Sequence, residues 1–472
     1  MSSAQATPAT HAGFEPATVI AVVLLMPIAL YLAHYAGLAR VLYPASNLLL
    51  AAWLYARRSP WFAGQCLMLF CFVSLVRRLI DIQAGWDPAN PVLLTPYLCG
   101  SLTVFSFFSY WARPRPRYLG PMLLLLTCVI YGAVLALLED RLAAGAADLL
   151  KWSIGPLFAI YVLEQRERLA ELRGVLEGTL VGSATAIAAY GIFQYVDPPI
   201  WDAEWMKGVA DLGMTSIGQP EPFAVRVFST LNSPGSLGAI LSAAIVVASK
   251  HRLAIALPGM ALMAVALALC QYRTLWAATA LAVALVIVSR PVLLRPTNLL
   301  AIIGVAASLA ATTLIPDISQ TVSQRASTLT ALQGDESLEE RLSQYRALTR
   351  DDDLIVGHGL GQNSVVRKLD GLAPVVIDSG LIDIWSSLGV IAGTLFLAGL
   401  ACLVSPLFTT PAPTAPHLPF DRAIVLTTFL QLPMGSAHIG ELGFCAWLFL
   451  ALGLAALPAL NVPLPHPVVN SP

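Results

Sequence analysis

Long apolar runs separated by short polar breaks dominate the chain between residues 17 and 460. Most of these runs are about 20 residues long, which is the length of helix that crosses roughly 30 Å of hydrocarbon. A membrane barrel would instead show shorter segments of alternating polarity. The pattern predicts an all-α polytopic membrane protein with about 12–14 transmembrane helices. The expected spans are residues 17–38, 41–56, 61–80, 92–111, 119–138, 147–164, 174–195, 232–249, 253–271, 274–289, 298–315, 380–404, 423–438 and 442–460.

The composition agrees with a membrane environment. Hydrophobic residues make up 57% of the chain and charged residues only 12%, whereas soluble domains carry roughly 25% charged residues. A water-soluble fold has no place for so much apolar surface. The formal net charge of -1 gives no global field that attracts nucleic acid. We therefore expect membrane lipids as the surroundings and no nucleic-acid partner.

The sequence offers no motif for a metal or a nucleotide. Its seven cysteines lie in or at the ends of apolar runs, and none forms a Cys-x-x-Cys or Cys/His cluster. The glycine-rich stretch at residues 357–361 follows no βαβ unit, and nothing matches a P-loop. Disulfides, a metal, a cofactor and ATP-driven chemistry are therefore not expected.

Basic residues in the short loops predict the orientation of the bundle. Five successive loops after even-numbered spans contain Arg or Lys, which marks these loops and both termini as cytoplasmic. Basic residues also follow some odd-numbered spans, so the bias is clear without being absolute. The supporting residues are Arg57, Arg58, Arg113, Arg115, Arg117, Arg166, Arg168, Arg173, Lys250, Arg252, Arg290 and Arg295, and the opposing ones are Arg40, Arg77, Arg78, Arg141, Lys151, Lys207, Arg226 and Arg273.

Two long polar segments, residues 196–231 and 316–379, follow odd-numbered spans, so we expect both on the non-cytoplasmic side. Apolar residues recur at helical spacing between Ser337 and Thr349, which predicts a short helix on the membrane surface. We divide the chain into N-terminal helices (residues 1–173), a core with both polar loops (174–405), and C-terminal helices with a cytoplasmic tail (406–472).

Two arginines are not explained as cytoplasmic anchors. Arg226 lies just before a span, and Arg273 interrupts what would otherwise be one apolar hairpin. A guanidinium at that depth is costly, so it needs a partner or a function. Permanently charged, forked donors suit a pyrophosphate better than lysine does. The alternative is that each arginine reaches the interface or pairs with a carboxylate.

Several short motifs, taken in their order along the chain, resemble the O-antigen ligase and O-antigen polymerase superfamily. The resemblance covers roughly residues 175 to 405, and the upstream helices are generic. The motifs are Arg226…Asn232-Ser-Pro-Gly, Gln271-Tyr-Arg273, Arg341-x-x-x-Tyr345, Gly357-His-Gly-Leu-Gly361 and Asp378-Ser379-x9-Gly389.

Members of this family are metal-independent glycosyltransferases of the bacterial inner membrane with a mostly helical fold. The resemblance implies an undecaprenyl-pyrophosphate-linked glycan donor and transfer at the periplasmic face to a glycan or to lipid A-core. Arg226 and Arg273 would then hold the donor pyrophosphate, with Arg341 as a third contact. The physical logic is independent of the family, because preorganised cations stabilise the negative charge that a departing pyrophosphate gathers.

One position departs from the family pattern. Ligases of the family carry a His, then Asn, Ser or Gln, then nine residues and a Gly, and this His is the proposed base for the acceptor hydroxyl. Asp378 occupies the histidine position here, with Gly389 at the expected distance. A carboxylate can take a hydroxyl proton if burial raises its pKa or if deprotonation is late. The exchange favours a polymerase over a ligase. Asp378 can equally be the N-cap of the helix that begins near Ser379.

The remaining candidates lie on the same expected face. Arg346, Asn232 and Tyr345 are possible substrate contacts, and His358 belongs either to a glycine-rich turn or to the site. Asp383 is a second candidate base, because a carboxylate inside a span is a functional candidate. His438 and Glu441 either line the acceptor path or are merely solvated at a turn.

Three classes of function remain open. The leading one is an inverting glycan transferase of the polymerase or ligase type. A lipid-linked sugar flippase would bury ionisable groups near the midplane and show related halves, neither of which is evident in the sequence. A scaffold of a polysaccharide export complex would use residues 316–379 as a docking surface.

Overall fold

The computed structural model describes most of the chain. The described residues are 15–87, 90–114, 116–210, 216–250, 253–289, 336–350, 353–363, 367, 370–372, 377, 379–411 and 416–458. The span expected at residues 298–315 lies outside them, as does Asp378.

The described residues are helical, with one isolated bridge and no strand among them. Long apolar runs form helices because no backbone group can be left unpaired in hydrocarbon. The helices are α1 (Pro16–Leu32), α2 (Ala39–Ala56), α3 (Trp61–Ala84), α4 (Thr95–Ser101), α5 (Val104–Trp111), α6 (Leu119–Leu138), α7 (Leu142–Glu164), α8 (Leu169–Val196), α9 (Ile200–Ala210), α10 (Pro234–Ala248), α11 (Leu253–Leu269), α12 (Arg273–Ser289), α15 (Glu336–Leu348), α16 (Gly380–Thr409), α17 (Leu418–Phe429) and α18 (Gly440–Ala456).

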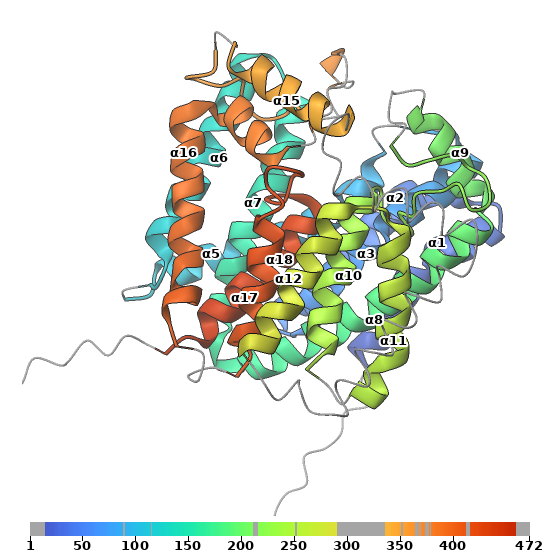
Figure 1. The fold of residues 1–472 in the computed structure, drawn as a ribbon, viewed down its shortest axis with the longest axis horizontal. Helices are drawn as coiled ribbons and strands as arrows, with labels where there is room; N and C mark the ends of the chain where they lie inside the picture. Colours follow the sequence, from blue (N-terminus) through green and yellow to red (C-terminus); the bar gives the residue numbers. More distant parts are fainter. Residues whose placement is uncertain are drawn as a thin grey trace, which may run out of the picture.

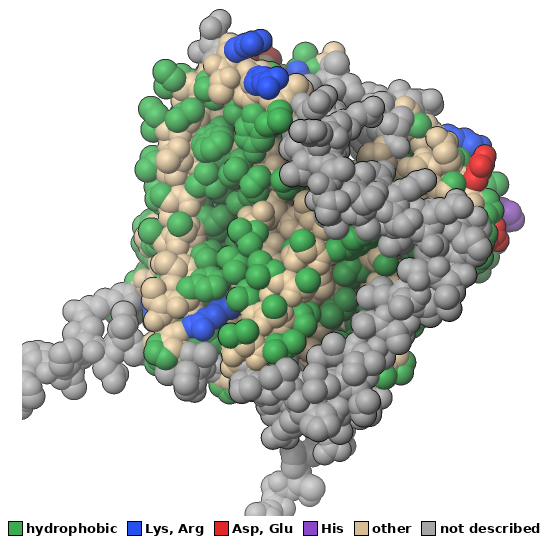
Figure 2. Space-filling view, viewed as in Figure 1, with side chains coloured by type: hydrophobic (Ala, Val, Ile, Leu, Met, Phe, Trp, Pro, Cys, Tyr) green, Lys and Arg blue, Asp and Glu red, His purple; other side chains and the backbone are tan. Residues whose placement is uncertain are grey.

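Six of the described helical segments are long and apolar enough to cross a membrane, and five shorter helices are also apolar. Hydrophobic side chains cover the body of the bundle, while charged side chains gather near α15 and α9 (Figure 2). The chain is therefore a helical, multi-pass membrane protein. The longer polar segments contain the expected helix α15 and one helix that the sequence analysis did not foresee, α9.

The expected span at residues 423–438 is wrong at its C-terminal end. Helix α17 ends at Phe429, and the residues after it form turns. Pro433 lacks the N–H that a continuing helix needs. Backbone carbonyls of this turn accept hydrogen bonds from other segments. Leu381 N donates to Leu432 O at 3.2 Å, and Tyr272 Oη donates to Met434 O at 2.8 Å. This turn becomes a wall of the functional site.

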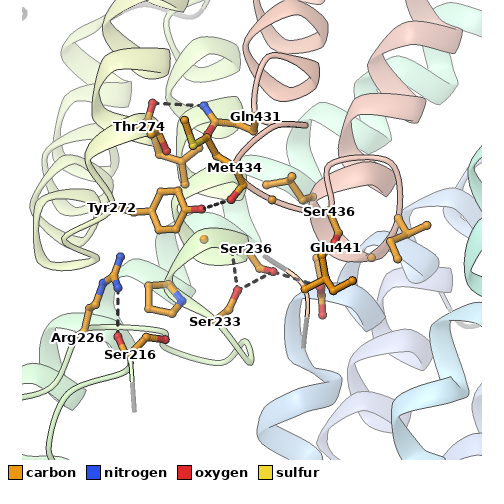
Figure 3. A pocket seen from close by; sticks show the side chains of 18 of the residues that line it. Ser216, Arg226, Ser233, Ser236, Tyr272, Thr274, Gln431, Met434, Ser436 and Glu441 are labelled. Carbon is orange, nitrogen blue, oxygen red and sulfur yellow. Dashed lines mark hydrogen bonds between the residues drawn. The ribbon is translucent and has the colours of Figure 1, made fainter. Parts of the chain in front are cut away.

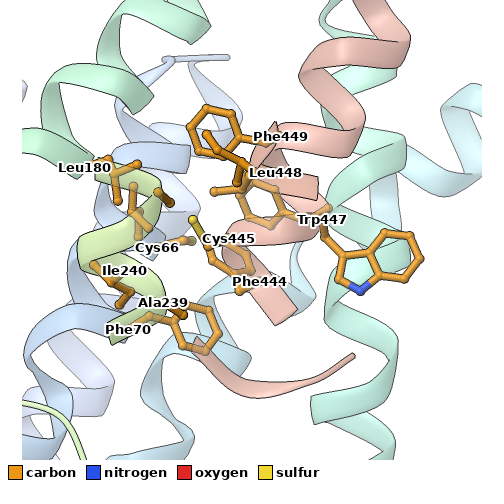
Figure 4. Packing of buried hydrophobic residues seen from close by; sticks show 14 of the residues in the cluster. Cys66, Phe70, Leu180, Ala239, Ile240, Phe444, Cys445, Trp447, Leu448 and Phe449 are labelled. Carbon is orange, nitrogen blue, oxygen red and sulfur yellow. The ribbon is translucent and has the colours of Figure 1, made fainter. Parts of the chain in front are cut away.

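Helix α18 forms the centre of the bundle. Every residue from Gly443 to Ala455 is buried, and α18 packs against α3, α7, α8, α10, α16 and α17. Phe444 of α18 lies 4.4 Å from Phe70 of α3 between ring centroids, beside Ile240 of α10 (Figure 4). Helices from both ends of the sequence are thus fixed around one apolar core.

The closest approach between α7 and α18 depends on Gly155. A Cβ at this position would lie 2.2 Å from Cδ1 of Trp447. We expect Gly155→Ala to destabilise the protein by about 1–3 kcal/mol through overpacking. Gly178→Ala on α8 is the matched control, since nothing lies within 4 Å of its added methyl group. Thermal denaturation of the detergent-solubilised protein measures both, and an undiminished melting temperature for Gly155→Ala contradicts the prediction.

The arginine-rich loops meet at one end of the bundle, here called the arginine-rich end. The Arg168 guanidinium contacts the carbonyl oxygen of Arg58. Arg117 Nη1 and Arg166 Nη2 both donate to the carbonyl of Leu457, at 3.2 and 2.9 Å. Helices α9 and α15 lie at the other end (Figure 1). Loops that the sequence analysis assigned to a single side therefore come together in space.

The glycine-rich turn at residues 357–361 lies against a break in α16. Gly389 has a φ of 73°, which interrupts the helix, and a Cβ on Gly357 would lie 2.2 Å from the Gly389 nitrogen. His358 N donates to Ser386 O at 2.8 Å beside this break. All three glycines in the turn have positive φ, a backbone conformation that other residues resist.

Candidate functional site

A pocket of about 540 Å³ lies where α10, α12 and α18 begin. We call it the central pocket. Its walls also include Tyr97, Lys151, Arg226 and the turn after α17 (Figure 3). Residues from all three segments into which we divided the sequence therefore line one cavity.

Three helix N-termini converge on the central pocket. Its lining includes Pro234–Ser236 of α10, Arg273–Leu275 of α12 and Gly440–Leu442 of α18, which are the first residues of each helix. A helix N-terminus carries unpaired N–H groups and about half a positive charge. Such ends bind phosphates and carboxylates. Three of them at one cavity favour an anionic ligand.

Three cationic side chains also line the central pocket. Arg226 and Arg273, the two arginines singled out from the sequence, both line the central pocket. Lys151 of α7 joins them and was missed as a site residue. In the sequence, Lys151 is only a lysine near the start of an apolar run, and the sequence analysis used it only as evidence against the predicted orientation. Asp148 holds Lys151 at 2.8 Å.

The Arg226 guanidinium is fixed by backbone carbonyls and an aromatic ring. Its Nε donates to Cys270 O at 3.0 Å, Nη1 to Ser216 O at 3.1 Å and Nη2 to Gln271 O at 3.2 Å. The Tyr272 ring centroid lies 5.5 Å from the guanidinium carbon. These partners hold the guanidinium in place at the wall of the pocket.

Glu441 places one carboxylate on the side opposite Arg226 and Tyr272 (Figure 3). Ser236 Oγ lies 3.3 Å from Glu441 Oε2 and 3.1 Å from Ser233 Oγ. Ser233 is the N-cap of α10 and accepts from Ser236 N at 3.0 Å. The pocket therefore has a cationic wall and a wall of hydroxyls that ends in a carboxylate.

Asp383 and His438 form a buried pair behind the central pocket. Asp383 Oδ2 lies 3.3 Å from His438 Nε2, and Asn363 Nδ2 donates to Asp383 Oδ1 at 2.8 Å. The imidazole packs on Trp152, with 4.4 Å between ring centroids. Neither residue of the pair lines the pocket. The pair fixes the start of α16 to the turn before α18, which forms one wall of the pocket.

The alternative interpretation of Asp378 as a helix cap is wrong. The N-cap of α16 is Ser379, whose Oγ accepts from Ile382 N at 3.4 Å and lies 2.8 Å from Tyr345 Oη. Asp378 itself is outside the described residues, so its role as a base stays a prediction. Ile377, the residue just before Asp378, lines the central pocket.

The other candidates whose side chains the structure describes do not line the central pocket. Arg346 is exposed on α15, and Arg341 lies on the same helix with its side chain outside the described part of the chain. His358 belongs to the glycine-rich turn, and the buried Asn232 Oδ1 has no hydrogen-bond partner among the described residues. The structure thus brings Arg226, Arg273 and Glu441 together at one pocket.

Within the ranges that the structure describes, no group of three His, Cys, Asp or Glu side chains is arranged to hold a metal ion. The polar groups at the central pocket are cations, hydroxyls, side-chain amides and backbone N–H groups, with Glu441 as the carboxylate in its described lining. These groups suit a phosphate-containing ligand.

No protein-family model, curated protein or solved structure matches the chain.

Proposed function

We propose that this protein is an inverting, metal-independent glycan transferase that uses an undecaprenyl-pyrophosphate-linked glycan as donor. The observation that carries the proposal is the central pocket, where three helix N-termini meet Arg226, Arg273 and Lys151. This field fits a diphosphate better than a neutral sugar or a cation.

The reaction follows from the charges on the two walls of the pocket. The acceptor hydroxyl oxygen attacks the anomeric carbon, and the bond from that carbon to the pyrophosphate oxygen breaks. Negative charge then moves onto the pyrophosphate, next to Arg226 and Arg273. Donors that are already oriented toward this charge lower the barrier without reorganising.

The proton of the acceptor hydroxyl needs a base. Asp378 is the residue that the family motif assigns, and Glu441 is the carboxylate within the described lining of the pocket. Glu441 lies across the cavity from Arg226 (Figure 3), so an acceptor on its side faces the anomeric carbon of a donor held on the other. Either carboxylate can accept the proton as the new C–O bond forms.

We place the protein in the bacterial inner membrane with the arginine-rich end in the cytoplasm, which follows from the positive-inside bias. The central pocket then opens toward the periplasm, together with α9 and α15. Polymerisation is favoured over ligation, because the family's ligase histidine is replaced by Asp378. The product class is an O-antigen or exopolysaccharide.

Reconstitution of the purified protein into liposomes tests the proposal. Supplied with the lipid-linked repeat unit of the source strain, a polymerase yields longer lipid-linked chains and free undecaprenyl pyrophosphate. A ligase yields product only after lipid A-core is added. A flippase moves the donor across the bilayer and leaves every glycosidic bond unchanged, and that result would refute the transferase.

A further inference from the structure

A second pocket lies on the α3 and α9 side of the molecule. It encloses about 360 Å³, and three of its lining residues are tryptophans: Trp86, Trp201 and Trp205. We call it the tryptophan pocket. Two of the three belong to α9, the helix in the first long polar segment.

Trp201 and Trp205 are held in position from behind. Trp201 Nε1 donates to Tyr190 Oη at 2.7 Å. The Trp205 ring lies 4.9 Å from the Phe228 ring between centroids and 5.5 Å from the guanidinium carbon of Arg78. Trp205 is only 5% exposed. These rings are fixed before any ligand arrives, which lowers the entropic cost of binding.

Trp86 closes the pocket from the end of α3. It is 37% exposed. Its indole lies against Gly208, where an added Cβ would come within 2.9 Å of Trp86 Nε1. The Arg77 guanidinium carbon is 5.9 Å from the ring. A glycine on α9 therefore permits the close approach that completes the aromatic wall.

Polar groups alternate with the rings around the tryptophan pocket. Asp81, Glu204 and Lys207 contribute carboxylates and an ammonium group to its lining. Glu204 and Lys207 are exposed and pair at 2.7 Å, so they still have capacity for further hydrogen bonds. A lipid acyl chain would leave such groups without partners. A sugar can contact both the aromatic and the charged lining residues. Its C–H faces pack on the indole rings, and its hydroxyls bond to the charged groups.

One short path of residues links the linings of the two pockets. Arg226 lines the central pocket, and three residues further along Ser229 O accepts from Arg78 Nη2 at 2.6 Å. Arg78 lines the tryptophan pocket. Three residues of chain span at most about 10 Å. The segment that carries Arg226 is therefore fixed directly to a residue of the tryptophan pocket.

We propose that the tryptophan pocket is a glycan-binding site that holds sugar residues of the chain being extended. The choice of glycan rests on the proposed function. A chain anchored there stays close to the donor site between transfers, so the site governs how many repeats are added before release. The residues that hold it are Trp86 and Trp201, with Glu204 and Lys207 at the rim.

Isothermal titration of the detergent-solubilised protein with delipidated polysaccharide of the source strain, as long chains and as single repeats, tests the site. We expect the dissociation constant for long chains to rise about 3- to 10-fold in Trp86→Ala and in Trp201→Ala, since each removes one aromatic contact. In the transfer assay the first addition should continue while the product chains become shorter. Trp111→Ala is the control, since Trp111 is also an exposed tryptophan and lies close to the arginine-rich end.

The inference and the proposed function can fail separately. Unchanged glycan binding in the Trp86→Ala/Trp201→Ala double variant overturns the glycan site, whether or not transfer occurs. Quenching of these tryptophans by brominated phosphatidylcholine in nanodiscs, without glycan binding, identifies a lipid contact instead. Glycan binding that depends on Trp86 in a protein with no transferase activity keeps the site and refutes only the enzyme.

Discussion

Arg273→Ala is expected to lower the rate of glycan transfer by at least about 100-fold, as the loss of one preorganised donor to a developing anion commonly does. Arg273 is the first residue of α12, so its side chain and the helix N-terminus act on the same volume of the central pocket. The helix dipole survives the substitution, but the full positive charge does not. The rate is measured in liposomes with saturating lipid-linked donor.

Two further variants serve as comparisons for Arg273→Ala. Arg273→Lys keeps the charge but loses the forked geometry, so an intermediate rate is expected. Arg350→Ala removes an exposed arginine just after α15 and should leave the rate unchanged. Gel-filtration profiles must match the parent protein in each case. If Arg273→Ala transfers glycan at the parental rate, Arg273 is an interfacial anchor and the diphosphate assignment fails.

Hydropathy located most of the helices because a membrane span leaves a length and composition signal that depends on nothing else in the fold. The exception at the end of α17 is instructive. Residues 430–439 include Leu430, Leu432 and Met434, yet Pro433 cannot continue the helix and the segment turns into the pocket. Helix α9 was missed for the opposite reason. It is a short helix with mixed polarity, and its tryptophans are explained only by what packs behind them.

The site was partly predictable from local chemistry. Arg226 and Arg273 stood out because each is costly where it lies, and the structure places both at one pocket. Lys151 and Glu441 join them only through the packing of α7 and α18. The pair of Asp383 and His438 likewise joins residues far apart in the sequence. These contacts depend on which helices pack side by side. No local pattern in a single sequence encodes that packing.

Arg78 and Asp202 explain how α9 and the Arg226 segment are fixed to the bundle. Both side chains are fully buried, with 2.7 Å between Arg78 Nη1 and Asp202 Oδ1. Tyr190 Oη and Gln194 Nε2 also donate to Asp202, at 2.9 and 2.6 Å. Gln194 Oε1 in turn accepts from Ser229 N at 2.8 Å. This network joins α3, α8 and α9 to the segment that carries Arg226.

Asp202→Ala is therefore expected to cost about 3–5 kcal/mol of stability, because it leaves the Arg78 guanidinium buried without its counter-ion. Unfolding by SDS in mixed micelles measures the loss. Glu204→Ala on the same helix is the matched control, since its ion pair with Lys207 is exposed and contributes only about 0–1 kcal/mol. The loss of stability in Asp202→Asn should lie between those of the two alanine variants, because the amide oxygen still accepts a hydrogen bond.

Transfer activity should decline with stability, because the segment that Arg78 holds at Ser229 also carries Arg226. Equal effects of Asp202→Ala and Glu204→Ala would mean that α9 is held by its apolar face alone, and the buried ion pair would then have no part in shaping the site.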